Sequence, residues 1–168
     1  MSSNVRTFVF AATLCLICGI LLTSASEGLK ARKIENVILD KQKNILKALN
    51  LIQANQKMTR DNVIQTYNDN VQDMVVDKTG TLVAASGNDG LPVFVYKKED
   101  TIKGYAMPFE AQGLWSLVKG FISLDGDGKT VKGFTVYSHG ETPGLGGECD
   151  RPWFQNQFKN TIFLIFQK

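Results

Sequence analysis

Residues 131–148 have the sequence VKGFTVYSHGETPGLGGE, in which a β-strand pattern runs into a glycine-rich polar loop. Residues 131–138 are strand-like because β-branched and aromatic side chains predominate. Residues 139–148 contain four glycines, one proline and two carboxylates. Glycine permits positive φ and close backbone approach, whereas proline fixes φ and lacks an N–H donor. This loop can therefore expose backbone N–H groups and lay Leu145 against a flat ligand, although an ordinary tight polar loop has the same composition.

The segments around this loop have the pattern of a mixed α+β domain. Short β-rich runs separated by turn residues predict strands, and Thr59 offers an N-cap to a short helix. Residues 125–128, Asp-Gly-Asp-Gly, indicate a hairpin turn and not a calcium loop, which would need a closing Glu. The expected helices are 59–67 and 152–158, the expected strands are 71–76, 81–85, 91–96, 103–109, 114–124 and 130–138, and a further turn is expected at 88–90.

Residues 8–25 form an uncharged apolar run of about 18 residues, close to the minimum that crosses a bilayer core. A cleavable signal peptide is an alternative, because residues 24–26 (Ser-Ala-Ser) are small enough for a cleavage site. A helical apolar stripe continues after the run without a break, which favours a retained anchor. The stripe consists of Ile34, Val37, Ile38, Ile45, Leu46, Leu49 and Ile52. The expected division is a segment with a transmembrane helix at 1–26, an amphipathic helical stem at 27–58 and a domain at 59–168.

Charge is unevenly distributed along the chain. Residues 1–60 carry 9 Lys and Arg against 3 Asp and Glu, whereas residues 61–168 carry 10 against 13, so the net charges are +6 and −3. Positive charge beside an apolar helix favours contact with lipid head groups. The acidic domain argues against nucleic-acid binding. Basic residues flank both ends of the apolar run, so charge does not determine its orientation.

The side chains present limit the chemistry of the chain. One histidine, His139, and no cluster of thiols argue against a metal site. Cys15 and Cys18 have C-x-x-C spacing but lie inside the apolar run, so redox chemistry is not expected of them. Cys149 is interpreted as an inert loop residue unless it is exposed. No nucleophile has a persuasive partner base, so no catalytic residue is predicted, and a planar cofactor or a partner protein remains as the ligand.

Residues 113–116 (GLWS), residues 140–148 (GETPGLGGE) and Trp153 closely resemble the C-subunit family of the bacterial sodium-translocating NADH:quinone reductases. The resemblance covers nearly the whole chain, including LDKQ at 39–42, and is weak between about residues 59 and 101. The G-subunit of the Rnf electron-transport complex shares the ETPGLG run and is the alternative. The GLWS motif and the doubled glycine before the second Glu favour the quinone reductase.

The resemblance implies an FMN-binding domain, with the flavin joined covalently through a phosphoester to a threonine. It implies a place in a six-subunit inner-membrane complex that oxidises NADH, reduces ubiquinone to ubiquinol and exports sodium ions. The bilayer is then a further partner, and the domain lies on the periplasmic side. The resemblance implies that Trp115, Thr142 and Leu145 lie beside the flavin ring. It implies that Glu141, Gly144 and Gly146 shape the loop.

One family feature does not occur in these 168 residues, namely the attachment motif Ser/Thr-Gly-Ala-Thr. The sequence also ends on an apolar run at 162–166. The expectation is therefore a C-terminally truncated chain with an incomplete domain, no covalent FMN, weak or absent flavin binding and no activity in isolation. Thr142 is the alternative acceptor, but its place in the loop favours contact with the ring. A membrane-tethered scaffold without flavin remains a further alternative.

Overall fold

The computed structural model describes residues 3–53, 56–77, 79–85 and 90–162, and these fall into two compact units, Met1–Ile38 and Leu39–Lys168. The predicted turn at 88–90 and the apolar run at 162–166 lie largely outside the described residues. In chain order the described elements are α1 (Ser3–Ala48), α2 (Arg60–Asn70), β1 (Val71–Val76), β2 (Leu82–Ala84), β3 (Leu91–Lys98), β4 (Thr101–Gln112), β5 (Leu117–Asp125), β6 (Val131–Ser138), the 3-10 helix η1 (Gly146–Asp150), α3 (Pro152–Gln155) and the 3-10 helix η2 (Asn156–Phe158).

Helix α1 contains the apolar run. Within the described residues it is the one helix that is long and apolar enough to cross a membrane, by length and composition. Every side chain described between residues 4 and 38 is exposed, including Phe8 at 75% and Leu22 at 73%. The uncharged run at 8–25 is apolar on all sides of the helix, which is typical of a helix in a large protein core or in a membrane.

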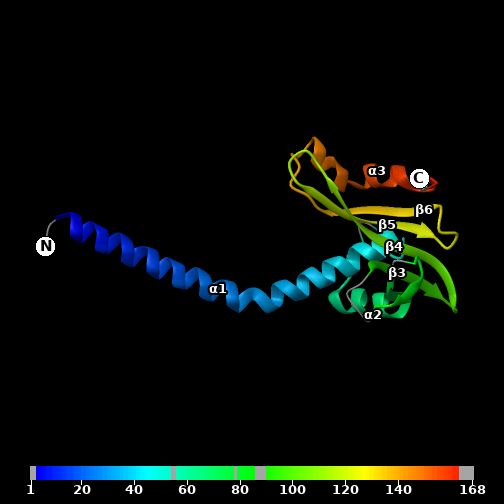
Figure 1. Cartoon of the computed structure of the whole chain (residues 1–168), viewed down its shortest axis with the longest axis horizontal. Coiled ribbons are helices and arrows are strands. Elements are labelled where there is room, and N and C mark those ends of the chain that lie inside the picture. The colour runs from blue at the N-terminus through cyan, green and yellow to red at the C-terminus, as the bar shows by residue number, and fades with distance from the viewer. Residues whose placement is uncertain (1–2, 54–55, 78, 86–89, 163–168) are drawn as a thin grey trace. The chain divides into compact units, whose positions relative to one another are not determined.

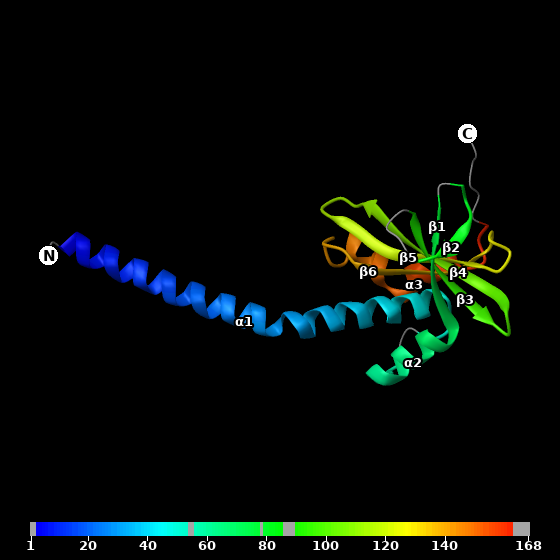
Figure 2. The same cartoon turned by 60° about the horizontal axis from the view of Figure 1, so that its bottom comes forward.

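The second unit is built on an antiparallel sheet. Its described strands number six, in the order β2-β1-β3-β4-β5-β6. The longest pairing joins β4 to β5, from Gly104 opposite Asp125 to Gln112 opposite Leu117. Figure 2 shows the strands crossing one another as the sheet twists, and α3 lies beside β6. The predicted α+β fold, a helix followed by a mixed domain, is confirmed.

The last turns of α1 form the centre of the core. Ile45, Leu46 and Leu49 are fully buried, and they belong to one cluster with Phe94 of β3 and Phe121 of β5. The two phenylalanine rings meet edge to face, with centroids 5.9 Å apart. Helix α2 packs into the same cluster beside the end of α1 (Figure 1). Because burying one large aliphatic side chain stabilises a fold by about 1.5–3 kcal/mol, this helix end is a major part of the domain's stability.

A Schellman motif ends α1 and fixes where the chain turns back toward the sheet. The N–H of Leu51 donates to the carbonyl oxygen of Leu46 at 2.9 Å, and the N–H of Asn50 donates to that of Lys47 at 3.0 Å. Asn50 has a φ of 57°, a left-handed conformation that asparagine tolerates at this position. Its side-chain amide donates to the carbonyl oxygen of Lys132, which ties the helix end to β6.

Strand β6 lies directly against the end of α1. On the neighbouring strand β5, the buried hydroxyl of Ser123 donates to the carbonyl oxygen of Ala48. A Cβ atom at Gly133 would lie 2.1 Å from that same oxygen. The absence of a side chain at this position is therefore what allows the helix backbone to reach the strand.

Several strand boundaries differ from those predicted, and the two largest differences flank one hairpin loop. β4 extends to Gln112, beyond the predicted end at 109, and β5 begins at Leu117, after the predicted start at 114. The intervening residues form the β4–β5 hairpin loop, and contacts to a distant part of the sequence hold them. The predicted helix at 152–158 is divided into α3 and η2.

Replacing Gly133 with alanine is expected to destabilise the domain by about 1–3 kcal/mol or more, because the methyl group would overlap the Ala48 carbonyl. The measurement is urea unfolding of the full chain in detergent, followed by far-UV circular dichroism. Gly28→Ala is the matched control, since nothing lies within 4 Å of a Cβ atom built there. Equal stability of the two variants would contradict the close approach of α1 and β6.

Candidate functional site

The carboxylate of Glu141 joins the β4–β5 hairpin loop to the loop that follows β6. Its Oε1 accepts hydrogen bonds from the backbone N–H groups of Trp115 and Ser116, each at 3.0 Å. Its Oε2 accepts one from the N–H of Leu114 at 3.3 Å. Because Glu141 is only 9% exposed, these donors replace water around the charge. Two segments that lie 25 or more positions apart in the sequence therefore form one structure.

Glycines border this carboxylate because larger residues would collide with it. A Cβ atom at Gly113 would lie 2.5 Å from Oε1 of Glu141, and one at Gly146 would lie 2.9 Å from Oε2. Ser116 adds a second link between the loops, since its Oγ accepts a hydrogen bond from the N–H of Gly140. Gly146 thus lies at a point where the loop requires the absence of a side chain.

The tip of the loop after β6 is a tight turn. The carbonyl oxygen of Thr142 accepts hydrogen bonds from the N–H groups of Leu145 at 3.1 Å and Gly147 at 3.0 Å. Pro143 occupies the second position of the turn, and Gly144 occupies the third with a φ of 76°. Proline followed by a residue at positive φ is the signature of a type II turn.

The two loops present apolar side chains and unused donors to a ligand. Leu145 is 75% exposed and Trp115 is 72% exposed. Within the described residues, the N–H groups of Gly144 and Gly146 and the hydroxyl of Thr142 have no hydrogen-bond partner. Apolar surface beside a small number of free polar groups is typical of a cofactor site. A flavin, with its flat apolar rings and polar edge, fits this set of groups.

A further set of contacts joins the two ends of the loop. The N–H of Glu141 donates to Nδ1 of His139 at 3.3 Å, and Nε2 of His139 lies 3.6 Å from Oδ2 of Asp150. Cys149 is half-buried. Burial, and after it the negative charge of Asp150, raises the pKa of the Cys149 thiol. A raised pKa keeps the thiol protonated and poorly nucleophilic at neutral pH.

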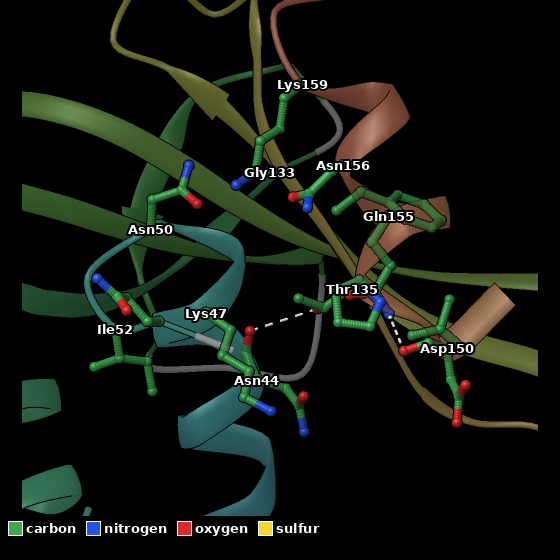
Figure 3. Close-up of a pocket in the computed structure, with 14 residues that line it drawn as sticks. Asn44, Lys47, Asn50, Ile52, Gly133, Thr135, Asp150, Gln155, Asn156 and Lys159 are labelled. Carbon is green, nitrogen blue, oxygen red and sulfur yellow. Dashed lines mark hydrogen bonds between the residues drawn. The ribbon is translucent and has the colours of Figure 1, made fainter. Parts of the chain in front are cut away.

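A separate cleft of about 520 Å³ lies between the end of α1, β6 and the segment after η1 (Figure 3). Asp150 lines it, and Gln155 donates to the Asp150 carbonyl oxygen at 3.0 Å. Amide and lysine side chains supply much of its polar surface, including Asn50 and Lys47. The described residues that line this cleft include none of those predicted to contact FMN.

The structure brings the predicted site residues together. Trp115, Glu141 and Gly146 meet at the carboxylate, and the other three predicted residues form the turn beside it. Sequence reasoning did not assign Ser116 or Asp150 to the site. Ser116 could have been assigned from its place in the GLWS motif. No sequence feature indicates that Asp150 lies close to the start of the loop.

The chain matches known proteins along most of its length. Residues 113–164 match the FMN-binding domain family. The C-subunit of the Na(+)-translocating NADH-quinone reductase from Yersinia pestis is 30% identical over 91% of this chain and 69% of its own length. The Pasteurella multocida C-subunit is 34% identical, with 90% and 70% covered. The crystal structure of the C-subunit from Parabacteroides distasonis superposes with a TM-score of 0.67 at 28% identity, with 80% of this chain and 70% of that chain covered.

The fold and the paired loops therefore define an FMN-binding domain that follows a helix of membrane-spanning length and composition. The chain belongs to the C-subunit family of the Na(+)-translocating NADH-quinone reductases. The predicted family and the predicted FMN cofactor are both confirmed.

The ionisation of Glu141 makes the stability of the paired loops dependent on pH. The hydrogen bond from the Trp115 N–H lowers the pKa of Glu141, burial opposes this shift, and the bonds from Ser116 and Leu114 add to the lowering. A carboxyl group with a lowered pKa in the folded state stabilises the fold above its unfolded pKa, and this stabilisation is lost as the pH falls through the folded value.

Glu141→Gln is therefore expected to lower the unfolding temperature at pH 6–7, with a difference from the wild type that shrinks as the pH falls below about 4.5. Thermal unfolding across this range is the measurement. Glu99→Gln, a substitution in an exposed turn, controls for the loss of one surface carboxylate. A difference in unfolding temperature between wild type and Glu141→Gln that stays constant to the lowest pH would contradict the stabilising role of the ionised Glu141 carboxylate.

Proposed function

We propose that this chain is a flavin-bearing electron relay in a sodium-translocating NADH:quinone reductase, which oxidises NADH, reduces ubiquinone to ubiquinol and exports sodium ions. The observation that carries the proposal is the Glu141 carboxylate. It holds the GLWS segment against the ETPGLGG loop, so that the two motifs shared with the family make one surface. The relatives at 30% and 34% identity bear the name of that reductase's C-subunit.

FMN supplies the electron transfer when it is bound. Trp115 and Leu145 would provide aromatic and aliphatic surfaces for the flat rings. The hydroxyl of Thr142 and the free N–H groups of Gly144 and Gly146 would hold polar atoms of FMN. Glu141 acts on the backbone and not on the ligand, because its oxygens already accept hydrogen bonds from the hairpin loop.

The membrane arrangement is also part of the proposal. Residues 1–26 would anchor the chain in the bacterial inner membrane, and residues 27–58 would form a stem whose last turns, at Ile45, Leu46 and Leu49, pack in the core of the domain. Residues 59–168 would supply the rest of the FMN-binding domain, on the periplasmic side. The exposed apolar surface of α1 supports the anchor, and the positive charge of residues 1–60 supports contact with lipid head groups. The other members of a six-subunit complex would be its protein partners.

The FMN site is tested by titrating FMN into the full chain in detergent and following quenching of flavin fluorescence. Trp115→Ala and Leu145→Ala are each expected to weaken binding by roughly tenfold, because each removes a surface that packs on the rings. Leu91→Ala is the matched control, since Leu91 on β3 is 75% exposed, as Leu145 is. Equal weakening by Leu91→Ala and Leu145→Ala, or no FMN binding at all, would contradict the site.

The proposed orientation is tested with a fluorescent reporter that matures only in the cytoplasm, fused after the last residue. The fusion is expected to stay dark in cells, because the domain would lie outside the cytoplasm. The same reporter fused before residue 1 is the control and should fluoresce. A bright C-terminal fusion would reverse the orientation, and a soluble product that begins near Ser26 would contradict the anchor.

A further inference from the structure

His139 is the one histidine in the sequence, and its ring contacts both ends of the loop that carries Glu141. The backbone N–H of Glu141 donates to Nδ1 at 3.3 Å. On the other side of the ring, Nε2 lies 3.6 Å from Oδ2 of Asp150. The His139 side chain is 18% exposed, so little water competes for either nitrogen. A Cβ atom built at Gly147 would lie 3.4 Å from Cε1, which places the ring against the backbone of the loop.

These contacts are compatible with one neutral form of the ring. Nδ1 must lack a proton in order to accept the hydrogen bond from Glu141, so the proton of the neutral imidazole resides on Nε2. With the proton on Nδ1, two N–H donors would face each other across 3.3 Å. The Nε2 atom, which then carries the proton, lies 3.6 Å from a carboxylate oxygen, and the negative charge attracts this proton even at a distance longer than a hydrogen bond.

We propose that His139, as the neutral Nε2–H tautomer, is a positioning residue that fixes the backbone of Glu141 and, through the Glu141 carboxylate, the loop that carries Trp115. The carboxylate must meet backbone donors from three successive residues, so the direction of the Glu141 side chain has to be set closely. The hydrogen bond to His139 restrains the Glu141 backbone, and Asp150 restrains the ring. The bearing of this arrangement on FMN rests on the proposed function, whereas the tautomer and the loop geometry do not.

The tautomer can be observed directly because the sequence has a single histidine. The experiment is a long-range ¹⁵N–¹H correlation spectrum of the imidazole in the full chain, in detergent, at about pH 8 and with an affinity tag that contains no histidine. The expected result is a protonated Nε2 and an unprotonated Nδ1. A protonated Nδ1, or rapid averaging of the two tautomers as in free histidine, would overturn the proposal.

Two substitutions separate the two contacts of the ring. His139→Asn keeps an acceptor at the place of Nδ1 and loses the group that faces Asp150, whereas His139→Gln keeps a donor near the place of Nε2 and loses the acceptor. Hydrogen exchange of the Glu141 amide is expected to stay within about threefold of the wild type in His139→Asn and to accelerate roughly tenfold in His139→Gln. Equal exchange rates in the two variants would overturn the proposal. If His139→Gln does not fold, the tautomer of the wild type and the exchange rate of the Glu141 amide in His139→Asn still test the proposal.

FMN titration of the same variants separates this inference from the proposed function. His139→Gln is expected to bind FMN roughly tenfold more weakly than His139→Asn, because the Asn variant keeps the acceptor for the Glu141 N–H and the Gln variant leaves the Trp115 loop poorly held. If the wild type binds no FMN, the proposed function fails while the tautomer and exchange results stand. If FMN binds the two variants equally, His139 does not position the site.

Discussion

The burial of the last turns of α1 is the packing interaction on which the domain depends. Ile45, Leu46 and Leu49 come from one helix end and contact side chains from α2, β3 and β5, so they hold elements that no short hairpin joins. The Schellman motif stops the helix where this contact is complete, and Gly133 lets its backbone reach β6. The hairpin loop and the loop after β6 emerge from strands that this core holds in register. Loss of the helix end would therefore affect the site through the sheet, without any direct contact.

Within the site, the charge of Glu141 serves the protein and not the ligand. A buried carboxylate is costly unless donors surround it, and the hairpin loop supplies donors from its own backbone. These hydrogen bonds stabilise both partners. They also satisfy N–H groups that a tight hairpin loop leaves without strand partners. The ligand is left to the apolar side chains and the free donors of the turn. Because the Glu141 charge is taken up by the backbone of the hairpin loop, an acidic loop can accept an anionic cofactor.

Local patterns predicted much of the fold because strands and turns are encoded by neighbouring residues. The strand predicted at 71–76 coincides with β1, and that predicted at 130–138 differs from β6 by one residue. The start of β5 was not predictable in this way, since Trp115 and Ser116 are held out of the strand by a carboxylate some 25 positions later. The apolar stripe that ends α1 was visible, but the sequence could not show that distant strands would cover it. The link from His139 to Asp150 depends on the path of the whole loop, which no local pattern encodes.

The type II turn at Pro143 and Gly144 has a thermodynamic consequence for any ligand of the loop. Ordering a flexible backbone costs roughly 1–2 kcal/mol per residue, and a proline, a glycine at positive φ and a satisfied carboxylate together order this loop during folding. The entropy is then already lost before a ligand arrives, so association requires little rearrangement and its free energy is not reduced by ordering. A loop of the same length made of serine and threonine would offer similar polar groups but would have to be ordered by each ligand that binds.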